Sequence, residues 1–574
     1  MLMNYSFHLL CFYFLCIVQG QAEEDAEGEK HNEEASASKE RREYLRRVVA
    51  VTHFLGKQGL PFRGHNESTD STNRGNFLEC MELLKEFDPF LQTYNPPSNV
   101  QYTSATSQNE MVDCCAQEVT SAIVCEMKDS KYYAIMADEA RDGKAEQLAI
   151  CVRYVSGGSV KESFLSLSEI KSFDAWTVAN ELQQQIQNHD VAELTCVAQT
   201  YDGAAVMSGF TGGVQAHFRR LHPEAIYVHC YAHELNLVLC HTCKAIPEAV
   251  EVFSLLECMY SFFSTSLVHH HKFMEAQVRL GLKKVELVQL STTRWACQLR
   301  SICAVLDALS AILECLSTIT SPVAVGLRAK LCKFSSIYSL LMFQSLLSVT
   351  EGLHKLLEKE SLDLADACIY KQAVCDTLKV KRTDAFSTEL YSKTKALCHT
   401  YNIPEPCVKT RNKQRKMDDF VLETVAGSRS EFDNAETLKR DLLFPCVDRM
   451  VGELETRFCT VDAELLKGIQ ACCPKSENFL SDADLTIFAK HYNIELRNEE
   501  VLVAKNFLAR KTETGCGPKD MLSVHNLLDS DMFPSLKSII QVALTVPVSS
   551  CSCERSVSAL HRVHSWLRQT MGQK

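Results

Sequence analysis

Short apolar runs alternate with amphipathic helical patterns between Lys131 and Cys230, and this order constrains the fold more than any other feature of the sequence. Three strand-like runs come first, at the short spacing of a meander: 131–137, 147–155 and 162–167. After them, helical and strand-like patterns alternate: helix 177–188, strand 193–200, helix 214–221 and strand 225–230. The pattern predicts an α/β unit in which later strands are joined through helices.

Two aspartates, Asp138 and Asp202, each come directly after one of these apolar runs. If the two strands are neighbours in one sheet, both carboxylates emerge at the same sheet end, where open α/β sheets bind their ligands. An aspartate after a strand is also a common turn former or helix N-cap, so spacing alone leaves the purely structural interpretation open.

Glu554 is a third acid of interest, because it lies at the start of a helical pattern over 553–567. Three acidic groups at one point repel one another unless cations neutralise them, and hard oxygen ligands suit Mg²⁺ or Mn²⁺. Two such ions about 3.5 to 4 Å apart could activate water or a 3′-hydroxyl for phosphoryl transfer. The three acids are therefore candidate metal ligands.

The remaining sequence divides into segments of different texture. Residues 23–44 are acidic and polar and predict a solvated linker, and helical patterns over 43–55, 77–87 and 108–127 predict a helical region over 45–130. From 296 to about 545 the patterns are almost entirely helical, interrupted by a polar stretch over 409–419. The predicted domains are therefore a core over 131–295, a helical insertion over 296–545 and a final segment over 546–574.

Charge and cysteine usage limit the classes of function. The net charge of -12 excludes a generally basic nucleic-acid coat, so any DNA binding requires a local positive surface. The best local basic run is that of Lys409, Arg411, Lys413, Arg415 and Lys416. The 27 cysteines follow no disulfide framework and indicate reduced thiols in a cytosolic or nuclear protein.

The N-terminus conflicts with that interpretation. Residues 6–18 (SFHLLCFYFLCIV) form a short apolar run that resembles a secretory signal ending near Ala22, although no Lys or Arg precedes it. A secreted chain would begin near Glu23 and should be rich in disulfides. We favour an artefact of gene assembly over a working signal, and no other segment is long and apolar enough to span a membrane.

Five sequence motifs in a fixed order resemble those of hAT-superfamily transposases, in particular the hAT-like regions of zinc-finger MYM-type and TTF-type proteins. They are Ala137-Asp138-Glu139 with Asp142, 201–209 (YDGAAVMSG), 228–237 (VHCYAHELNL), Thr293-Arg294-Trp295, and 547–560. A further motif, 54–65 (FLGKQGLPFRGH), also resembles this subgroup, but its residues suggest no chemical role. The resemblance covers roughly residues 45–574.

The resemblance implies an α/β RNase H-like core interrupted by a large all-α insertion, with a C-terminal hAT dimerisation segment. It implies that Asp138, Asp202 and Glu554 are the catalytic triad, which binds two Mg²⁺ or Mn²⁺ ions and drives cut-and-paste DNA transposition. Cys230 and His233 match the family's Cys-x-x-His element, which is thought to support the active site. A structural zinc site with the nearby Cys and His residues is the rival interpretation, and no second ligand pair completes it.

DNA contacts are implied at Arg294 and Trp295, the tryptophan being associated in the family with stacking on a flipped base. Lys413, Arg415 and Lys416 are candidate phosphate contacts, and a solvated loop is the alternative. The apolar stripe of the final helix resembles the start of the dimerisation region, which implies self-association. Family members usually continue further at this end, so the dimerisation segment is expected to be truncated. No BED-type or other zinc-finger module precedes Leu45, so the means of finding transposon ends is expected to be lost.

The sequence therefore suggests a hAT transposase-derived nuclear protein. Ancestrally it would be a metal-dependent enzyme that cleaves and joins strands at transposon ends, and retention of the triad leaves activity undecided in a decayed or domesticated element. The alternative is a non-catalytic nuclear scaffold for dimerisation and DNA or protein binding. A secreted protein is a third hypothesis, resting only on the N-terminal run.

Overall fold

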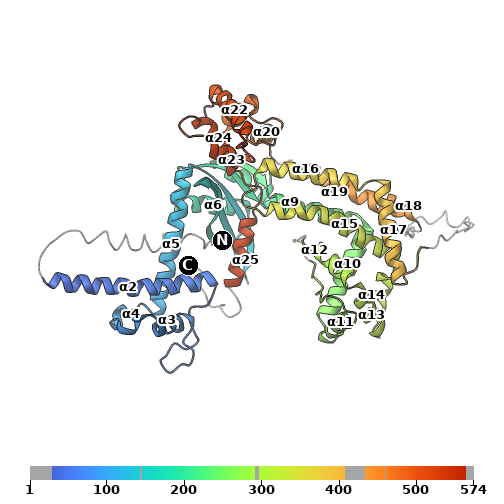
Figure 1. Cartoon of the computed structure of the whole chain (residues 1–574), viewed down its shortest axis with the longest axis horizontal. Coiled ribbons are helices and arrows are strands. Elements are labelled where there is room, and N and C mark those ends of the chain that lie inside the picture. The colour runs from blue at the N-terminus through green and yellow to red at the C-terminus, as the bar shows by residue number, and fades with distance from the viewer. Residues whose placement is uncertain (1–28, 143–144, 291–295, 407–433, 459–460, 564–574) are drawn as a thin grey trace, which may run out of the picture. The chain divides into compact units, whose positions relative to one another are not determined.

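The computed structural model describes residues 29–142, 145–290, 296–406, 434–458 and 461–563 (Figure 1). The chain divides into two compact units. The first comprises residues 1–199, 205–226 and 550–574, and the second comprises residues 200–204 and 227–549.

The first unit opens with helices that build a small core of their own. Tyr44, Val48, Val51 and Leu55 recur along one side of α2 and pack with Phe77 and Leu91. The helices of this region are α2 (Glu29–Gln58), α3 (Asn76–Phe87), α4 (Pro89–Thr93), η1 (Ser98–Val100) and α5 (Ala105–Ser130).

Helix α2 corrects the expectation of a solvated linker over 23–44, because the helix already begins at Glu29. The segment that was assigned to a linker is rich in Ala, Glu, Lys and Arg, which are good helix formers. Arg47 reinforces the helix through an ion pair of 2.8 Å with Glu43, one turn earlier. Local propensity therefore outweighs the acidic composition.

The motif over 54–65 has a structural role in this region. After α2 ends, the backbones of Gly64 and Gly75 approach so closely that a Cβ on Gly75 would lie 2.1 Å from the Gly64 nitrogen. Gly75 also has a φ of 98°, which other residues rarely adopt. The Phe77 amide donates to the Phe62 carbonyl over 2.9 Å. The two glycines therefore allow the chain to come back on itself at the base of the loop over 64–75.

A five-stranded sheet follows, in the order β3-β2-β1-β4-β5. The hairpin between β2 and β3 turns at Gly157 and Gly158, whose φ values of 57° and 71° suit a two-residue turn. β2 pairs antiparallel with β1 and with β3. The strands are β1 (Tyr132–Asp142), β2 (Ala145–Ser156), β3 (Ser159–Glu169), β4 (Thr195–Tyr201) and β5 (Ile226–His229), which agrees with the five predicted runs.

The position of Asp138 differs from the prediction. Asp138 does not follow a strand but lies within β1, opposite Ala149 of β2. Pairing with β2 extends β1 through the polar residues 138–142, which carry no apolar signal of their own. β1 and β4 are neighbours, as the carboxylate hypothesis required, and the Thr195 amide donates to the Lys131 carbonyl where both strands begin.

Two helices that connect the later strands, α6 (Ala175–Asn188) and α8 (Val214–Leu221), lie where the periodicity predicted them. The short helix α7 (Ala205–Ser208) between β4 and α8 was not predicted. The final helix α25 (Cys551–Val563) also belongs to the first unit, although more than 300 residues separate it from β5 in the sequence. It begins two residues earlier than predicted, and the predicted end at Leu567 lies outside the described residues.

In the second unit every regular element described after β5 is a helix. None of the described helices is long and apolar enough to cross a membrane. The helices are α9 (Tyr231–Ala245), α10 (Pro247–Ser264), α11 (Leu267–Arg279), α12 (Ala296–Asp307), α13 (Leu309–Thr318), α14 (Pro322–Leu331), α15 (Phe334–Leu357), α16 (Leu364–Val380), α17 (Asp384–Thr400), α18 (Ala435–Leu438), the π-helix η3 (Lys439–Leu443), α19 (Phe444–Arg457), α20 (Ala463–Ala471), α21 (Asp482–His491), α22 (Asn498–Glu513), α23 (Met521–Leu527) and α24 (Pro534–Thr545).

Candidate functional site

The first turn of α25 packs on the sheet beside Asp138. Cys553 is fully buried against Met136 of β1 and against Ala149 and Cys151 of β2. Side chains two residues apart on a strand share a face, so Asp138 lies on the same face as Met136. The sheet therefore carries Asp138 on the face that α25 covers, next to the residue that precedes Glu554.

The exposure of the two carboxylates differs. Asp138 is half-buried, whereas Glu554 is exposed. The pKa of the Cys553 thiol is raised by burial first, then by Cys151, and also by the negative charge of Asp138. A thiol held neutral beside an acid suits a packing role for Cys553.

A buried ion pair fixes the start of α25. Arg153 is 1% exposed and its Nη1 lies 2.7 Å from Oε1 of Glu162, which is 6% exposed. The other oxygen of Glu162 accepts from the Ser552 hydroxyl, and the Arg555 guanidinium lies 3.6 Å from it. Arg555 also donates to Ser552 over 2.6 Å. These contacts join β2 and β3 to the turn that bears Glu554.

In the second unit, Asp202 begins a tight loop after β4. Its Oδ1 accepts from the Ala204 amide over 3.1 Å, and its carbonyl accepts from the Tyr227 hydroxyl over 3.3 Å. A Cβ on Gly203 would lie 2.3 Å from Nε2 of His229. Glycine is therefore required at this position, because the His229 ring packs directly on the loop backbone.

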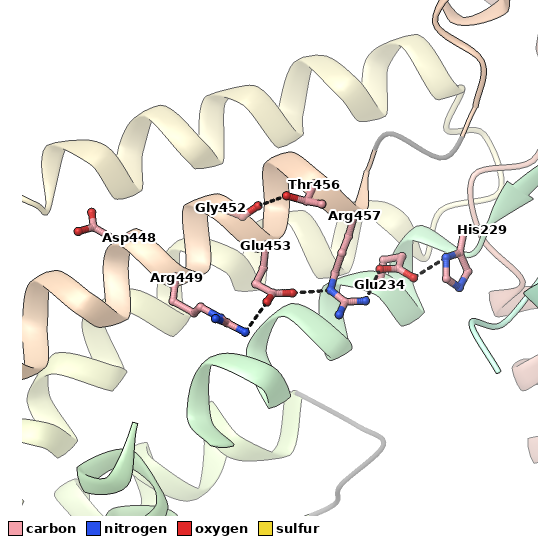
Figure 2. A pocket seen from close by; sticks show the side chains of 8 residues that line it. All are labelled: His229, Glu234, Asp448, Arg449, Gly452, Glu453, Thr456 and Arg457. Atoms are coloured by element: carbon pink, nitrogen blue, oxygen red, sulfur yellow. Dashed lines mark hydrogen bonds and ion pairs between the residues drawn. The ribbon is translucent and has the colours of Figure 1, made fainter. Parts of the chain in front are cut away.

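His229 belongs to a chain of charged groups that runs along α9 to α19 (Figure 2). Its Nδ1 is paired with Oε1 of Glu234, which is 1% exposed, and Oε2 of Glu234 lies 3.2 Å from Nη1 of Arg457. Arg457 also pairs with Glu453 over 2.6 Å and contacts Nδ1 of His241 over 3.0 Å. The network therefore links His229, which packs on the Asp202 loop, to helix α19, which lies more than 200 residues later in the sequence.

A cavity of about 630 Å³ opens beside this network. Both of its arginines are paired: Arg449 lies 2.9 Å from Glu453, and Arg457 contacts both Glu453 and Glu234. The lining therefore offers no surplus positive charge for an anion. The lining residues are His229, Glu234, Asp448, Arg449, Gly452, Glu453, Thr456 and Arg457.

Glu234 should stabilise the second unit in a pH-dependent way. Burial alone would raise the pKa of its carboxyl, but pairing with His229 and Arg457 outweighs burial and lowers the pKa below 4.5. Such a group stabilises the fold above its ordinary pKa, and the stabilisation is lost as the pH falls through the lowered value. We expect Glu234→Gln to cost about 1 to 3 kcal/mol at neutral pH, with the difference from wild type shrinking in acid.

Thermal unfolding of wild type and Glu234→Gln across this pH range tests the expectation. Glu455→Gln is the matched control, because Glu455 lies on the same helix as Arg457 but its ion pair with Lys379 is about half exposed. The control should lose about 1 kcal/mol or less. A Glu234→Gln deficit that stays constant from neutral to acid pH would contradict the assignment.

Known proteins resemble this chain over most of its length. The "52 kDa repressor of the inhibitor of the protein kinase" of Homo sapiens is 23% identical over 575 residues, covering 93% of this chain and 73% of that protein. Its Mus musculus counterpart matches over 576 residues with the same identity and coverage. Residues 6–213 match the family DUF4371, described as "ZMYM1/FAM200, RNase-like domain". Residues 509–574 match the hAT family C-terminal dimerisation region. These matches make the chain similar to hAT-derived proteins.

The matched segments correspond to described elements. The RNase-like match contains α2 to α7 with β1 to β4, and the dimerisation match contains α23, α24 and α25. Helix α25 thus lies within the match to a dimerisation region while its first turn packs on the sheet of the RNase-like match. A helix from the dimerisation match therefore contacts the sheet from the RNase-like match.

Cys230 and His233 lie at the start of α9, and Cys230 adjoins the end of β4. Cys230 is buried, and its amide donates to the Tyr201 carbonyl over 3.0 Å at the end of β4. His233 is half-buried in α9, and its ring lies 6.4 Å from that of His229. Among the described residues, the three Asp, Glu, Cys or His side chains whose ligand atoms all lie within 4.8 Å of one another are Asp363, Asp366 and Cys473.

Other predicted site residues cannot be placed. Arg294, Trp295, Lys413, Arg415 and Lys416 lie outside the described residues, as do the apolar run over 6–18 and the polar stretch over 409–419. The sequence patterns predict no role for Glu162, Arg153 or Arg457, and Glu234 lies in the motif over 228–237 without a role of its own. A charged residue inside an apolar pattern is the one local signal that Arg153 and Glu234 offer.

Proposed function

We propose that this protein retains the metal-dependent DNA strand-cleaving and strand-transfer site of a hAT transposase, with Asp138, Asp202 and Glu554 as its ligands. The proposal includes an RNase H-like core that the helices between β5 and α25 interrupt. The observation that carries it is the packing of Cys553 on the face of the sheet that bears Asp138. This packing brings Glu554 to β1 from the far end of the sequence.

Asp202 joins the proposal through the strand order. β1 and β4 are neighbours and begin together at the hydrogen bond between Lys131 and Thr195. Asp138 is seven residues beyond Lys131, and Asp202 is seven residues beyond Thr195. Strands that run the same way advance by the same rise per residue, so equal counts favour equal heights for the two carboxylates.

The donor set fits Mg²⁺ or Mn²⁺. All three groups are carboxylates, the hard oxygen ligands that these ions prefer, and both Asp138 and Glu554 retain contact with solvent. When bound, the ions would supply charge stabilisation at the phosphate and a more acidic water or hydroxyl. Structural zinc at Cys230 and His233 finds less support, because Cys230 is buried at the start of α9 with its amide bonded to the end of β4.

The protein's own residues would position these ligands. Glu162 and Ser552 hold the first turn of α25, which limits the freedom of Glu554. The Ala204 amide and the Tyr227 hydroxyl hold the Asp202 loop, and His229 supports its glycine. Fixing charged groups before the substrate arrives is the main way in which a protein accelerates phosphoryl transfer.

Cleavage of labelled DNA by the full-length protein tests the proposal. We expect nicking of a duplex in the presence of Mn²⁺ or Mg²⁺, and none when EDTA removes the metal, because the carboxylates alone repel phosphate. Transposon-end sequences are the ancestral substrate. Failure to cleave any DNA at saturating Mn²⁺, by a folded protein that binds DNA, would contradict the enzymatic function.

A non-catalytic nuclear scaffold is the second candidate. The human and mouse relatives are both named as a repressor. This favours a regulatory nuclear role over transposition for this chain as well. The match to a hAT dimerisation region over 509–574 favours self-association. A scaffold should dimerise in sedimentation experiments and bind its partners equally well with or without Asp202→Asn, whereas cleavage depends on that residue.

A further inference from the structure

Among the exposed aromatic side chains of the first unit, two lie at or just before helices that connect the later strands and have no role in the proposed function. Phe210 is 87% exposed and Trp176 is 63% exposed. Burying such side chains is favourable by several kcal/mol, so their position on the surface invites an explanation. Phe210 precedes α8, and Trp176 lies in the first turn of α6.

The turn that carries Phe210 is rigid. The Gly213 amide donates to the Gly209 carbonyl over 2.9 Å, and the Gly209 amide donates to the Ala205 carbonyl over 3.1 Å. The two glycine backbones touch, since a Cβ on Gly213 would lie 2.4 Å from the Gly209 nitrogen. Gln215 donates to the same Gly209 carbonyl over 3.2 Å. Phe210 is therefore presented by a fixed turn, and ligand binding would cost little ordering of the backbone.

A guanidinium group lies beside this turn. Nη2 of Arg220 donates to the carbonyl of Thr211, the residue after Phe210, over 3.1 Å, and Nη1 contacts Nδ1 of His217 over 3.2 Å. Arg220 is exposed, and neither contact neutralises its charge with a carboxylate. An exposed cation thus accompanies the exposed aromatic ring.

Trp176 and Phe210 lie at the same end of one helical layer. Helix α6 leads to the start of β4, and α8 leads from the end of β4 to the start of β5. The Cys230 amide pairs with the Tyr201 carbonyl, so β4 and β5 end together and run the same way. Both helices therefore run opposite to β4, and His222 after α8 contacts Gln183 of α6 over 2.8 Å. Their N-termini, with Trp176 and Phe210, are at the end toward which β4 runs.

The chemistry around these rings suits a nucleobase better than a protein surface. Phe210 is flanked by Gly209, Thr211 and Gly212, and Trp176 follows the exposed Asp174. A protein interface of useful size needs a contiguous apolar patch, which these polar and glycine neighbours interrupt. Unpaired bases stack on single aromatic rings, and a neighbouring guanidinium can contact the phosphate.

The charge at the start of α6 limits which part of a nucleotide Trp176 can contact. Asp174 caps the helix, and hydrogen bonds from the Thr177 hydroxyl and amide and from Ser172 lower the pKa of its carboxyl to about 2. Its negative charge repels phosphate from this helix N-terminus. The group that Trp176 can bind is therefore the uncharged face of a base.

We propose that Phe210 and Trp176, with the guanidinium of Arg220, form a binding surface for the unpaired bases of a DNA strand. This surface rests on the proposed function in one respect, namely that DNA is the substrate. The residues are distinct from Arg294 and Trp295.

Fluorescence anisotropy of a labelled single-stranded oligonucleotide, with the full chain in EDTA, tests this surface without cleavage. Stacking is worth about 1 to 3 kcal/mol per base, so we expect Phe210→Ala and Trp176→Ala each to weaken binding about tenfold. Phe210→Tyr should bind like wild type, because it keeps the ring. The matched control is Phe87→Ala on α3, which removes a ring that is 76% exposed elsewhere in the first unit and should change nothing.

The outcomes separate this inference from the proposed function. If wild type binds single strands but both alanine variants bind as well as Phe87→Ala, the stacking surface is wrong and the DNA substrate is unaffected. If wild type binds neither single-stranded nor duplex DNA, the proposed substrate fails as well. If the alanine variants keep full DNA affinity but lose self-association, these rings belong to a protein interface and the inference is overturned.

Discussion

Asp202→Asn should lower metal-dependent strand cleavage about a hundred- to a thousandfold, the effect expected when one preorganised electrostatic group is lost. The amide keeps the shape of the side chain but removes the charge that attracts a divalent cation. Asp138→Asn and Glu554→Gln should lose activity on the same scale, because three carboxylates act on one site. Cleavage rates at saturating Mn²⁺ measure the effect.

A control on the same strand separates this effect from general damage to β1. Glu139 is exposed and follows Asp138, so its side chain points to the opposite face of the sheet. Glu139→Gln should cleave at the wild-type rate. All variants should unfold at nearly the wild-type temperature, since Asp138 and Glu554 retain contact with solvent. A wild-type rate for Asp202→Asn would remove that residue from the site.

Glu162→Ala should destabilise the first unit by about 3 to 5 kcal/mol, the cost of leaving a buried charge without its partner. Arg153 is 1% exposed and would lose the carboxylate that lies 2.7 Å from it. The same change removes the acceptor of the Ser552 hydroxyl at the start of α25. We expect the midpoint of thermal unfolding to fall by roughly 10 °C.

The neighbouring Lys161 provides the matched control. Its ion pair with Glu126 also measures 2.7 Å, but the two side chains are 27% and 21% exposed. Lys161→Met should therefore cost only about 1 kcal/mol or less. Replacing the whole buried pair, as in Arg153→Met with Glu162→Leu, should recover much of the loss, because no unpaired charge then remains. Equal losses for Glu162→Ala and Lys161→Met would contradict the role of the buried pair.

Local sequence signals predicted the elements well where periodicity was strong. The five strands and the helix Val214–Leu221 were predicted within a few residues, because each contains a clear apolar pattern between polar turns. The end of β1 was missed, since residues 138–142 carry no apolar alternation and are strand only because β2 pairs with them. The start of α2 was missed because acidic composition was given more weight than helix propensity.

Long-range contacts explain most of what the sequence could not reveal. Glu162 contacts Ser552 across 390 positions, and Glu234 contacts Arg457 across 223. No local pattern encodes which distant partner a buried carboxylate will have. The order of five motifs predicts the candidate ligands themselves. The packing of Cys553 beside Asp138 adds a physical reason for Glu554 to approach β1.

The location of Mn²⁺ in crystals of the full-length protein is the most direct test of the central claim. The proposal predicts an anomalous scattering peak about 2 to 2.5 Å from carboxylate oxygens of Asp138, Asp202 and Glu554. Crystals at saturating Mn²⁺ with no ion at these residues, and with the Glu554 carboxylate more than about 10 Å from that of Asp138, would contradict it.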